Sequence, residues 1–277
     1  NIQASDAAKL AVHWFESKQN EVAAEVADLF SKYRLSEALM AVYKLFWDEF
    51  SSWYLEMIKP AYGQGIDRTT YSATLCFLDN LLHLLHPFMP FITEELWQQM
   101  YERNAEEGES LMVSALSMDT YVDTAFVAQF EVVKGVISNI RSIRLQKNIA
   151  QKEPLDLQVL GENPVAEFNA VIQKMCNLSS ITVVESKAEG ASSFMVGTTE
   201  YAVPLGNMID VEAEIARMEA ELKHKEGFLQ GVLKKLSNEK FINNAPAAVL
   251  EMERKKQADA ESIISSLKES IAALKKA

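Results

Sequence analysis

Basic residues gather at two places along the chain, and each place could hold phosphate groups. The first is a predicted helix over residues 125–147 and the segment after it, with Lys134, Arg141, Arg144, Lys147 and Lys152. The second is a pair of heptad segments after residue 208, with Lys223, Lys234, Lys235, Lys240, Arg254 and Lys255. Lys and Arg bind phosphate oxygens through charge-assisted hydrogen bonds, so both groups are candidate contacts for a polyanion. The alternatives are a solvated helix face and the salt-bridged flanks of a coiled coil.

The charge of the chain is negative, but it is unevenly distributed. The formal net charge is −12. Residues 1–130 carry 8 basic and 19 acidic side chains, residues 131–209 carry 7 and 8, and residues 210–277 carry 12 and 12. This distribution argues against a general nucleic-acid-binding surface. Any polyanion partner must therefore meet local basic clusters.

Other residue pairs favour structure over catalysis. His83 and His86 are three residues apart and could share a metal, but no third ligand is evident, so we interpret them as core or helix-end residues. Glu94 and Glu95 could form an acid–base pair, but their position favours the first turn of a helix. The chain has no Gly-rich phosphate loop and no nucleophile–base arrangement. We predict no catalytic residue, no metal site and no cofactor in this chain.

The composition is that of a soluble globular protein, with 48% hydrophobic and 24% charged residues. No apolar run approaches the roughly 18 residues of a membrane span, and no secretion signal is visible. The two cysteines, Cys76 and Cys176, lie among apolar neighbours, and we interpret both as buried free thiols. These features predict a cytoplasmic protein without a membrane partner.

The first 123 residues carry the apolar spacing of packed helices. One helix has a main stripe that steps by three and four residues, made of Leu35, Leu39, Val42, Phe46, Phe50, Trp53 and Met57. A second stripe on the same helix contains Trp47, Tyr54 and Ile58. A helix that is apolar on most sides must be enclosed by other helices. The pattern predicts an antiparallel helical bundle over residues 1–123.

In the rest of the chain, the spacing of the apolar residues changes twice. After the helix at 125–147, short alternating segments at 155–160, 181–185, 193–196 and 201–205 predict strands, with a helix at 165–176 between them. Residues 124–207 are therefore expected to form a small α+β connecting unit. Residues 208–277 contain two heptad patterns that predict an antiparallel two-helix coiled coil. The expected fold class is mainly α.

Several motifs resemble one enzyme family. Residues 86–97 read HPFMPFITEELW, which resembles the signature of the anticodon-binding bundle in the valyl, leucyl and isoleucyl tRNA synthetases of class I. Residues 46–59, FWDEFSSWYLEMIK, resemble a bundle helix of the valyl branch, although many relatives have Cys-Asp where this chain has Ser51-Ser52. The segments SLMV at 110–113 and IRSIR at 140–144 also match. The ending, with VPLG at 203–206, IDVE at 209–212 and KLSNE at 235–239, resembles the coiled-coil tail of valyl enzymes.

The resemblance implies a tRNA-binding C-terminal region of a valyl-tRNA synthetase. It would recognise the anticodon and support the outer corner of valine tRNA, while a missing catalytic domain attaches valine with ATP and Mg. The family's catalytic signatures are absent here. A bundle that reads an anticodon needs aromatic platforms, and Trp47 and Tyr54 are the candidates, against core packing as the alternative. The implied partners are valine tRNA and the missing catalytic and editing domains, with the chain itself a monomer.

Two other functions stay open at this point. A helical scaffold with a coiled-coil arm for protein partners would also suit the acidic bundle and the neutral arm. Dimerisation through the arm would support that hypothesis. A free-standing enzyme is the remaining hypothesis, and the lack of a catalytic constellation argues against it.

Overall fold

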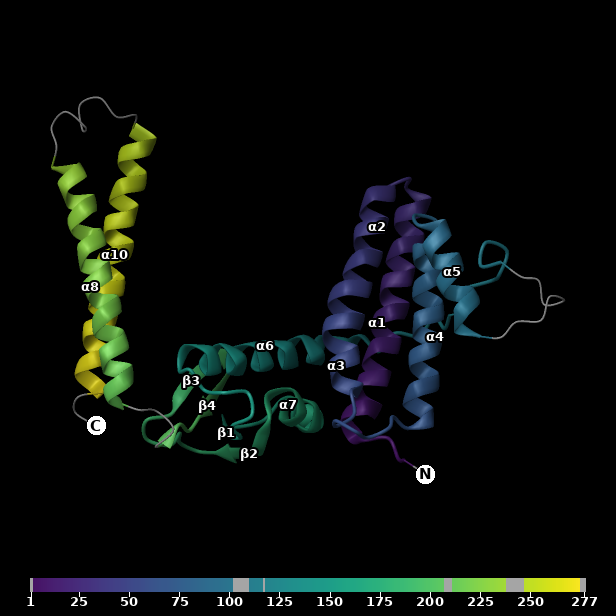
Figure 1. Cartoon of the computed structure of the whole chain (residues 1–277), viewed down its shortest axis with the longest axis horizontal. Coiled ribbons are helices and arrows are strands. Elements are labelled where there is room, and N and C mark those ends of the chain that lie inside the picture. The colour runs from purple at the N-terminus through teal and green to yellow at the C-terminus, as the bar shows by residue number, and fades with distance from the viewer. Residues whose placement is uncertain (1, 102–109, 117, 207–210, 238–246, 275–277) are drawn as a thin grey trace. The chain divides into compact units, whose positions relative to one another are not determined.

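The computed structural model describes residues 2–101, 110–116, 118–206, 211–237 and 247–274. The chain forms two compact units, Asn1–Pro204 and Leu205–Ala277. Helices dominate, and one small sheet lies in the first unit (Figure 1). The predicted mainly α fold class is confirmed. The boundary predicted after residue 207 falls close to the division between the units, whereas the boundary predicted after residue 123 lies inside the first unit and stays a prediction.

The first unit begins with a helical bundle. Its elements are α1 (Asp6–Ser31), α2 (Leu35–Lys44), the π-helix η1 (Leu45–Tyr54), α3 (Leu55–Ile58), α4 (Arg68–Leu85) and α5 (Pro90–Met100). Local chemistry fixes the helix starts. The Ser5 hydroxyl accepts the N–H of Ala8 at α1, and the Asp67 carboxylate accepts the N–H of Thr70 at α4. Such caps satisfy backbone donors that a helix start leaves unpaired.

The predicted long helix contains a π-helix at its centre. Within η1, the hydroxyls of Ser51 and Ser52 donate to backbone carbonyls five residues before them. A π-helix closes its hydrogen bonds over five residues instead of four, so side chains seven residues apart no longer lie on one face. Trp47 and Tyr54, predicted on one stripe, are therefore separated. Trp47 faces solvent, whereas Tyr54 is completely buried.

An aromatic cluster forms the core of the bundle. The ring of Phe15 on α1 lies 5.2 Å from Phe50 and 5.0 Å from Tyr54 on η1, and 5.1 Å from Phe77 on α4. All four side chains are buried. Ring pairs at this spacing add packing energy beyond the burial of their area, so the cluster ties three helices together.

A sheet with two helices follows the bundle. α6 (Thr124–Gln146) begins at Asp123, whose carboxylate accepts the N–H of Phe126. The strands are β1 (Leu155–Leu160), β2 (Leu178–Val184), β3 (Ser192–Val196) and β4 (Thr199–Val203), in the order β2-β1-β4-β3. β1 and β2 are parallel, and their connection contains the 3-10 turn η3 (Ala166–Phe168) and α7 (Asn169–Cys176). β4 is antiparallel to both of its neighbours.

α6 joins the bundle to the sheet. Near its start, Phe130 packs 4.2 Å from Trp14 of α1, and Phe126 packs 4.7 Å from Phe168 of η3. Further along, Gly135 lets β3 approach closely, because a Cβ there would lie 3.0 Å from a methyl group of Val196. One helix therefore contributes to two adjoining cores, and the bundle and sheet belong to a single compact unit.

The second unit is a two-helix arm, formed by α8 (Val211–Leu236) and α10 (Ala247–Leu274) (Figure 1). Glu226 pairs with Lys268 at 2.8 Å, and Lys235 approaches Glu253 at 3.8 Å, so the helices run antiparallel. The predicted heptad positions whose burial is described are all buried or half-buried. They are Met218, Leu222, Lys225, Leu229, Val232, Leu236, Leu250, Glu253, Gln257, Ala260, Ile264, Leu267 and Ile271. The predicted antiparallel coiled coil is confirmed for the described residues.

Candidate nucleic-acid interface

Lys134 on α6 is engaged by neighbouring groups, contrary to its predicted phosphate contact. Its ammonium lies 2.6 Å from a carboxylate oxygen of Glu49 and 2.8 Å from one of Glu131. It also lies 5.3 Å from the ring centre of Trp14 and 5.9 Å from that of Trp53. The side chain is only 13% exposed. Two carboxylates and aromatic faces already satisfy this cation, so Lys134 joins α6 to the bundle and is not available to a phosphate group.

Arg144 is also a structural residue, and its predicted role is corrected. The side chain is buried, and its guanidinium donates to the carbonyl oxygens of Ala150 at 2.9 Å, Cys176 at 2.7 Å and Asn177 at 3.3 Å. Burial lowers the pKa of Arg144, and nearby Cys176 and Glu153 partly offset that effect. The guanidinium therefore fastens the end of α6 to the end of α7.

Arg141 differs from both of these neighbours because it remains accessible. Its side chain is exposed, and its guanidinium carbon lies 5.7 Å from the ring centre of Trp53. Within the part of the chain that the structure describes, Arg141 has no ion pair and no side-chain hydrogen bond. It borders a hollow of about 470 Å³ at the junction of α3, α6 and α7. Arg141 remains a candidate phosphate contact.

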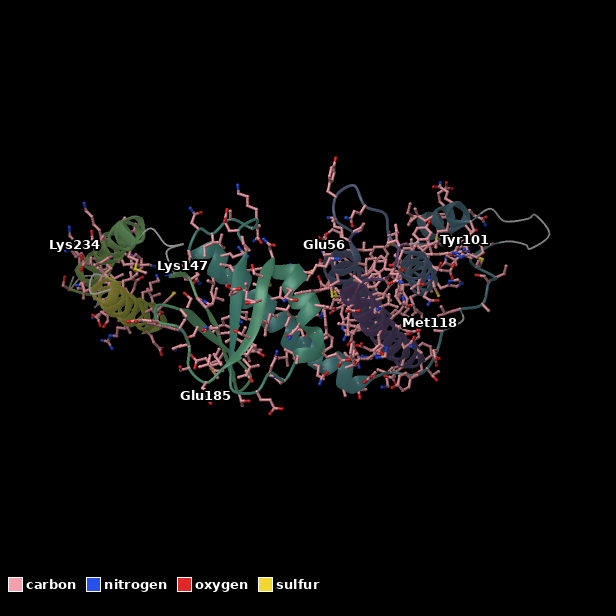
Figure 2. All side chains as sticks on the ribbon, turned by 90° about the horizontal axis from the view of Figure 1, so that it is seen from below. Glu56, Tyr101, Met118, Lys147, Glu185 and Lys234 are labelled. Carbon is pink, nitrogen blue, oxygen red and sulfur yellow. The ribbon has the colours of Figure 1, made fainter. Side chains whose placement is uncertain are left out.

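Lys147 and Lys152 lie at the far end of α6 and in the turn that follows. Lys147 is half-buried and labelled in Figure 2, and Lys152 is exposed. The side-chain amide of Asn177 donates to the Lys152 carbonyl at 3.0 Å, which holds the turn against the end of α7. The predicted phosphate contacts of both lysines stay predictions.

An exposed aromatic pair lies on the bundle. Trp47 is 60% exposed and Tyr43 is 52% exposed, and their rings are stacked 6.4 Å apart with an angle of 7° between them. Leu39, four residues before Tyr43, is also exposed. The three side chains therefore form one stripe that runs along α2 into η1. Tyr43 was not predicted, although its spacing of four residues from Trp47 could have indicated it. This stripe offers flat surfaces on which unpaired bases can stack.

Tyr54 cannot serve as a second platform, and that prediction is wrong. The side chain is completely buried, and its hydroxyl shares a 2.8 Å hydrogen bond with Thr74. Burial raises the pKa of Tyr54 to about 12. The ring belongs to the aromatic core of the bundle, and no base can reach it without unfolding that core.

The arm presents its predicted basic residues to solvent. The exposed ones are Lys223, Lys234 and Lys235 on α8, and Arg254 and Lys255 on α10. Lys234 is labelled in Figure 2. Only Lys235 of these five has a described ion-pair partner, at 3.8 Å, while Lys240 lies outside the described residues. These cations are available to a polyanion.

The domain composition agrees with this geometry. A model of the anticodon-binding domain of tRNA ligases matches residues 12–159, and a model of the tRNA binding arm of valyl tRNA synthetase matches residues 210–275. The chain is 71% identical over its whole length to the valine–tRNA ligase of Phocaeicola vulgatus, and 72% identical over 97% of its length to that of Bacteroides fragilis strain ATCC 25285. It is 62% identical over 99% of its length to that of Parabacteroides distasonis. The chain belongs to the valine–tRNA ligase family.

The matches cover the C-terminal region of this ligase family, and the chain spans about 30% of the length of the three relatives. The match to the anticodon-binding domain begins within α1 and ends within β1, and thus covers most of the bundle, α6 and most of the first strand. The arm match covers both α8 and α10. The HPFMPFITEELW motif at residues 86–97 forms the turn before α5 and most of α5 itself.

The two histidines considered as metal ligands, His83 and His86, are engaged in hydrogen bonds. His83 Nε2 lies 2.8 Å from the hydroxyl of Ser114, and His86 Nδ1 lies 2.8 Å from that of Thr93. Among the described residues, no three His, Cys, Asp or Glu side chains could hold a metal ion together. No described helix has the length and apolar character needed to cross a membrane.

Cys176 is buried as predicted, and burial raises its pKa to about 12. Cys76 is exposed, so its predicted burial is wrong. Its apolar neighbours Leu75 and Phe77 are adjacent along the helix and therefore face other directions.

Proposed function

We propose that this chain binds valine tRNA, with the bundle contacting the anticodon and the arm contacting the outer corner of the folded RNA. The observation that carries the proposal is the match of an anticodon-binding domain followed by a tRNA binding arm in one chain. The relatives are named valine–tRNA ligase, and the chain spans about 30% of their length. We assign valine attachment with ATP and Mg, and editing, to the remaining part of such a ligase.

The stripe of Leu39, Tyr43 and Trp47 supports a role in binding anticodon bases. Exposed rings stacked in parallel leave their outer faces free, and unpaired RNA bases bind such faces with little sequence preference. Specificity for the valine anticodon would then come from polar groups beside the stripe. Lys44 and Glu37 border a second hollow of about 370 Å³ next to Met40 and can contact base edges there.

The exposed cations of the arm support a role in binding phosphates. The five exposed basic residues that were predicted as contacts on the arm lie on both helices, and phosphate contacts of this kind depend strongly on salt. They carry little sequence information, so the arm would contribute affinity and placement. Arg141, Lys147 and Lys152 would add phosphate contacts in the first unit.

The test is a titration of this chain with valine tRNA and with one non-cognate tRNA at two salt concentrations. Preferential binding of valine tRNA that weakens as salt rises is the expected result. Equal affinity for both RNAs would overturn anticodon recognition by this chain. Absence of binding even at low salt would overturn the tRNA-binding role as a whole.

The scaffold hypothesis is the second candidate, and the arm bears on it directly. Among the residues of the arm whose burial is described, the apolar heptad positions are covered within one hairpin, and the exposed apolar side chains, such as Phe228 and Met252, are scattered. We therefore propose a monomer, and we propose the cytoplasm as its location. Sedimentation that shows a dimer strengthening with concentration would favour the scaffold hypothesis instead.

A further inference from the structure

The hollow beside Arg141 is bounded by both halves of the first unit. α3, the turn at 59–67 and the start of the chain from Ile2 to Ala8 form one side, and α6 and α7 form the other. Its volume of about 470 Å³ falls within the roughly 300–1,000 Å³ of typical ligand pockets. Glu56, labelled in Figure 2, lies on the bundle side, and Lys174 and Met175 lie on the α7 side.

Arg141 provides an oriented anion-binding group at this hollow. Its guanidinium is held above the ring of Trp53, which covers one face of the planar group. The edge of a guanidinium carries its N–H donors in a fork that matches two phosphate oxygens. No described acidic side chain pairs with Arg141, so these donors have no competing partner within the described chain.

Lys174 on α7 provides a second cation on the same side of the hollow as Arg141. Its ammonium donates to the carbonyl oxygen of Met57 at 2.6 Å, at the end of α3. That bond fixes the ammonium in place and uses only one of its three donors. Burial lowers the pKa of Lys174, which indicates a partly desolvated cation that an added anion would stabilise.

The carboxylates of the hollow are already engaged. Glu56 lies 3.3 Å from the ammonium of Lys59, and Asp67 accepts the N–H of Thr70 at 2.9 Å. Three cations line the hollow, namely Arg141, Lys174 and Lys59, against the two carboxylates. The hollow is therefore locally positive within a unit whose first 130 residues are strongly acidic.

We propose that this hollow holds one nucleotide of the bound RNA, with its phosphate contacted by Arg141 and Lys174. The inference rests on the proposed tRNA-binding function, which supplies the phosphate donor. It adds a contact site for the RNA at the junction of the bundle with α6 and α7, separate from the aromatic stripe and from the arm. The Arg141 guanidinium would donate hydrogen bonds to two oxygens of the phosphate, whereas the Lys174 ammonium would act as a single point charge.

The test compares wild type with Arg141→Gln, Arg141→Lys and a control, Lys187→Ala. Lys187 is an exposed cation of the same unit that pairs with Glu200 and does not line the hollow. Binding of valine tRNA is measured over a range of salt, together with interference by ethylated phosphates. Arg141→Gln should reduce the slope of log affinity against log salt by about 1, and one phosphate should lose its interference. Arg141→Lys should retain the slope and bind several-fold more weakly, and Lys187→Ala should match wild type.

One result would overturn the inference while leaving the proposed function intact. It is an unchanged salt slope together with the same set of interfering phosphates in Arg141→Gln. If wild type itself bound no tRNA, the proposed function would fail first. Circular dichroism of each variant separates loss of binding from loss of folding.

Discussion

α6 and the arm both carry clusters of basic residues, but the structure uses the two clusters differently. On α6, Lys134 lies between two carboxylates and three aromatic rings, and Arg144 is buried against backbone carbonyls. On the arm, Lys223, Lys234 and Arg254 are exposed. Only Arg141 on α6 combines exposure with a lack of ion-pair partners in the described chain.

The difference follows from what surrounds each cluster. The first unit has a large core and many carboxylates, so a cation on an inward face meets partners that satisfy it. The arm has one narrow apolar seam, and most of its remaining surface faces water. A basic cluster in sequence therefore indicates accessible cations better on a two-helix arm than on a helix shared by two cores.

The largest effect that would sharpen this comparison is expected for Arg144→Ala. The change leaves three carbonyl acceptors without their donor and opens a space at the end of α6. We expect a loss of about 3 kcal/mol in the free energy of unfolding. Urea denaturation measures it, with Arg141→Ala as the control, for which the change should stay within about 0.5 kcal/mol. Equal midpoints for the two variants would break the comparison.

The next effect concerns the exposed cations of the arm. We expect the combined change to alanine to weaken binding of valine tRNA at least roughly tenfold and to lower the salt slope by about 3, because several phosphate contacts are lost. The set consists of Lys223, Lys234, Arg254 and Lys255. The control changes three ion-paired, exposed cations of the first unit, Lys9, Lys32 and Lys187, and the losses are compared per charge removed. Comparable losses in both sets would show that the arm contributes only general charge.

A third prediction separates the two aromatic residues that the sequence placed together. Trp47→Ala should weaken binding of valine tRNA about tenfold, since stacking on an aromatic side chain contributes about 1–3 kcal/mol per base. Its unfolding free energy should change little, because the ring is exposed. Tyr54→Phe should do the reverse, losing about 1 kcal/mol of stability with the hydroxyl contact to Thr74 while binding is kept. Fluorescence titration with valine tRNA and urea unfolding of both variants test whether Trp47 acts in binding and Tyr54 in stability.

The smallest expected effect is a dependence of stability on pH at the start of α6. The N–H of Phe126 and then His13 lower the pKa of Asp123 in the folded chain. A lowered folded pKa means that this stabilisation is present above the unfolded value of about 3.9 and is lost as pH falls through the folded pKa. Melting curves at several acidic pH values should show a steeper loss in wild type than in Asp123→Asn, whose amide oxygen can still cap the helix. Parallel losses would exclude this contribution.

The sequence predicted what depends on local period. The heptads of the arm and the strand at 155–160 have strong periods, because one face of each element is buried. The π-helix η1 has no such signature in the sequence, because the apolar residues of this segment also fit the spacing of an α-helix. That single irregularity separated Trp47 from Tyr54.

The candidate site was harder to predict because its contacts are long-range. The partner of Lys134, Glu49, is 85 residues away in the chain, and the acceptor of Arg144 at Cys176 is 32 residues away. Charge counting along a sequence cannot show which cations such partners will satisfy. Lys174 was missed for the same reason, since its place at the hollow depends on the packing of α7 against α3.

The continuous helix α6 also fixes a length. Its 23 residues span about 35 Å, and the bundle is packed at one end while the turn with Lys152 follows the other. A helix that is packed against two cores changes its length very little, so it holds the bundle and the turn with Lys152 at a fixed distance from each other. RNA that touches both must present contacts at that separation. The first unit would therefore select its RNA by shape as well as by sequence, and an inserted turn in α6 would change which RNA fits.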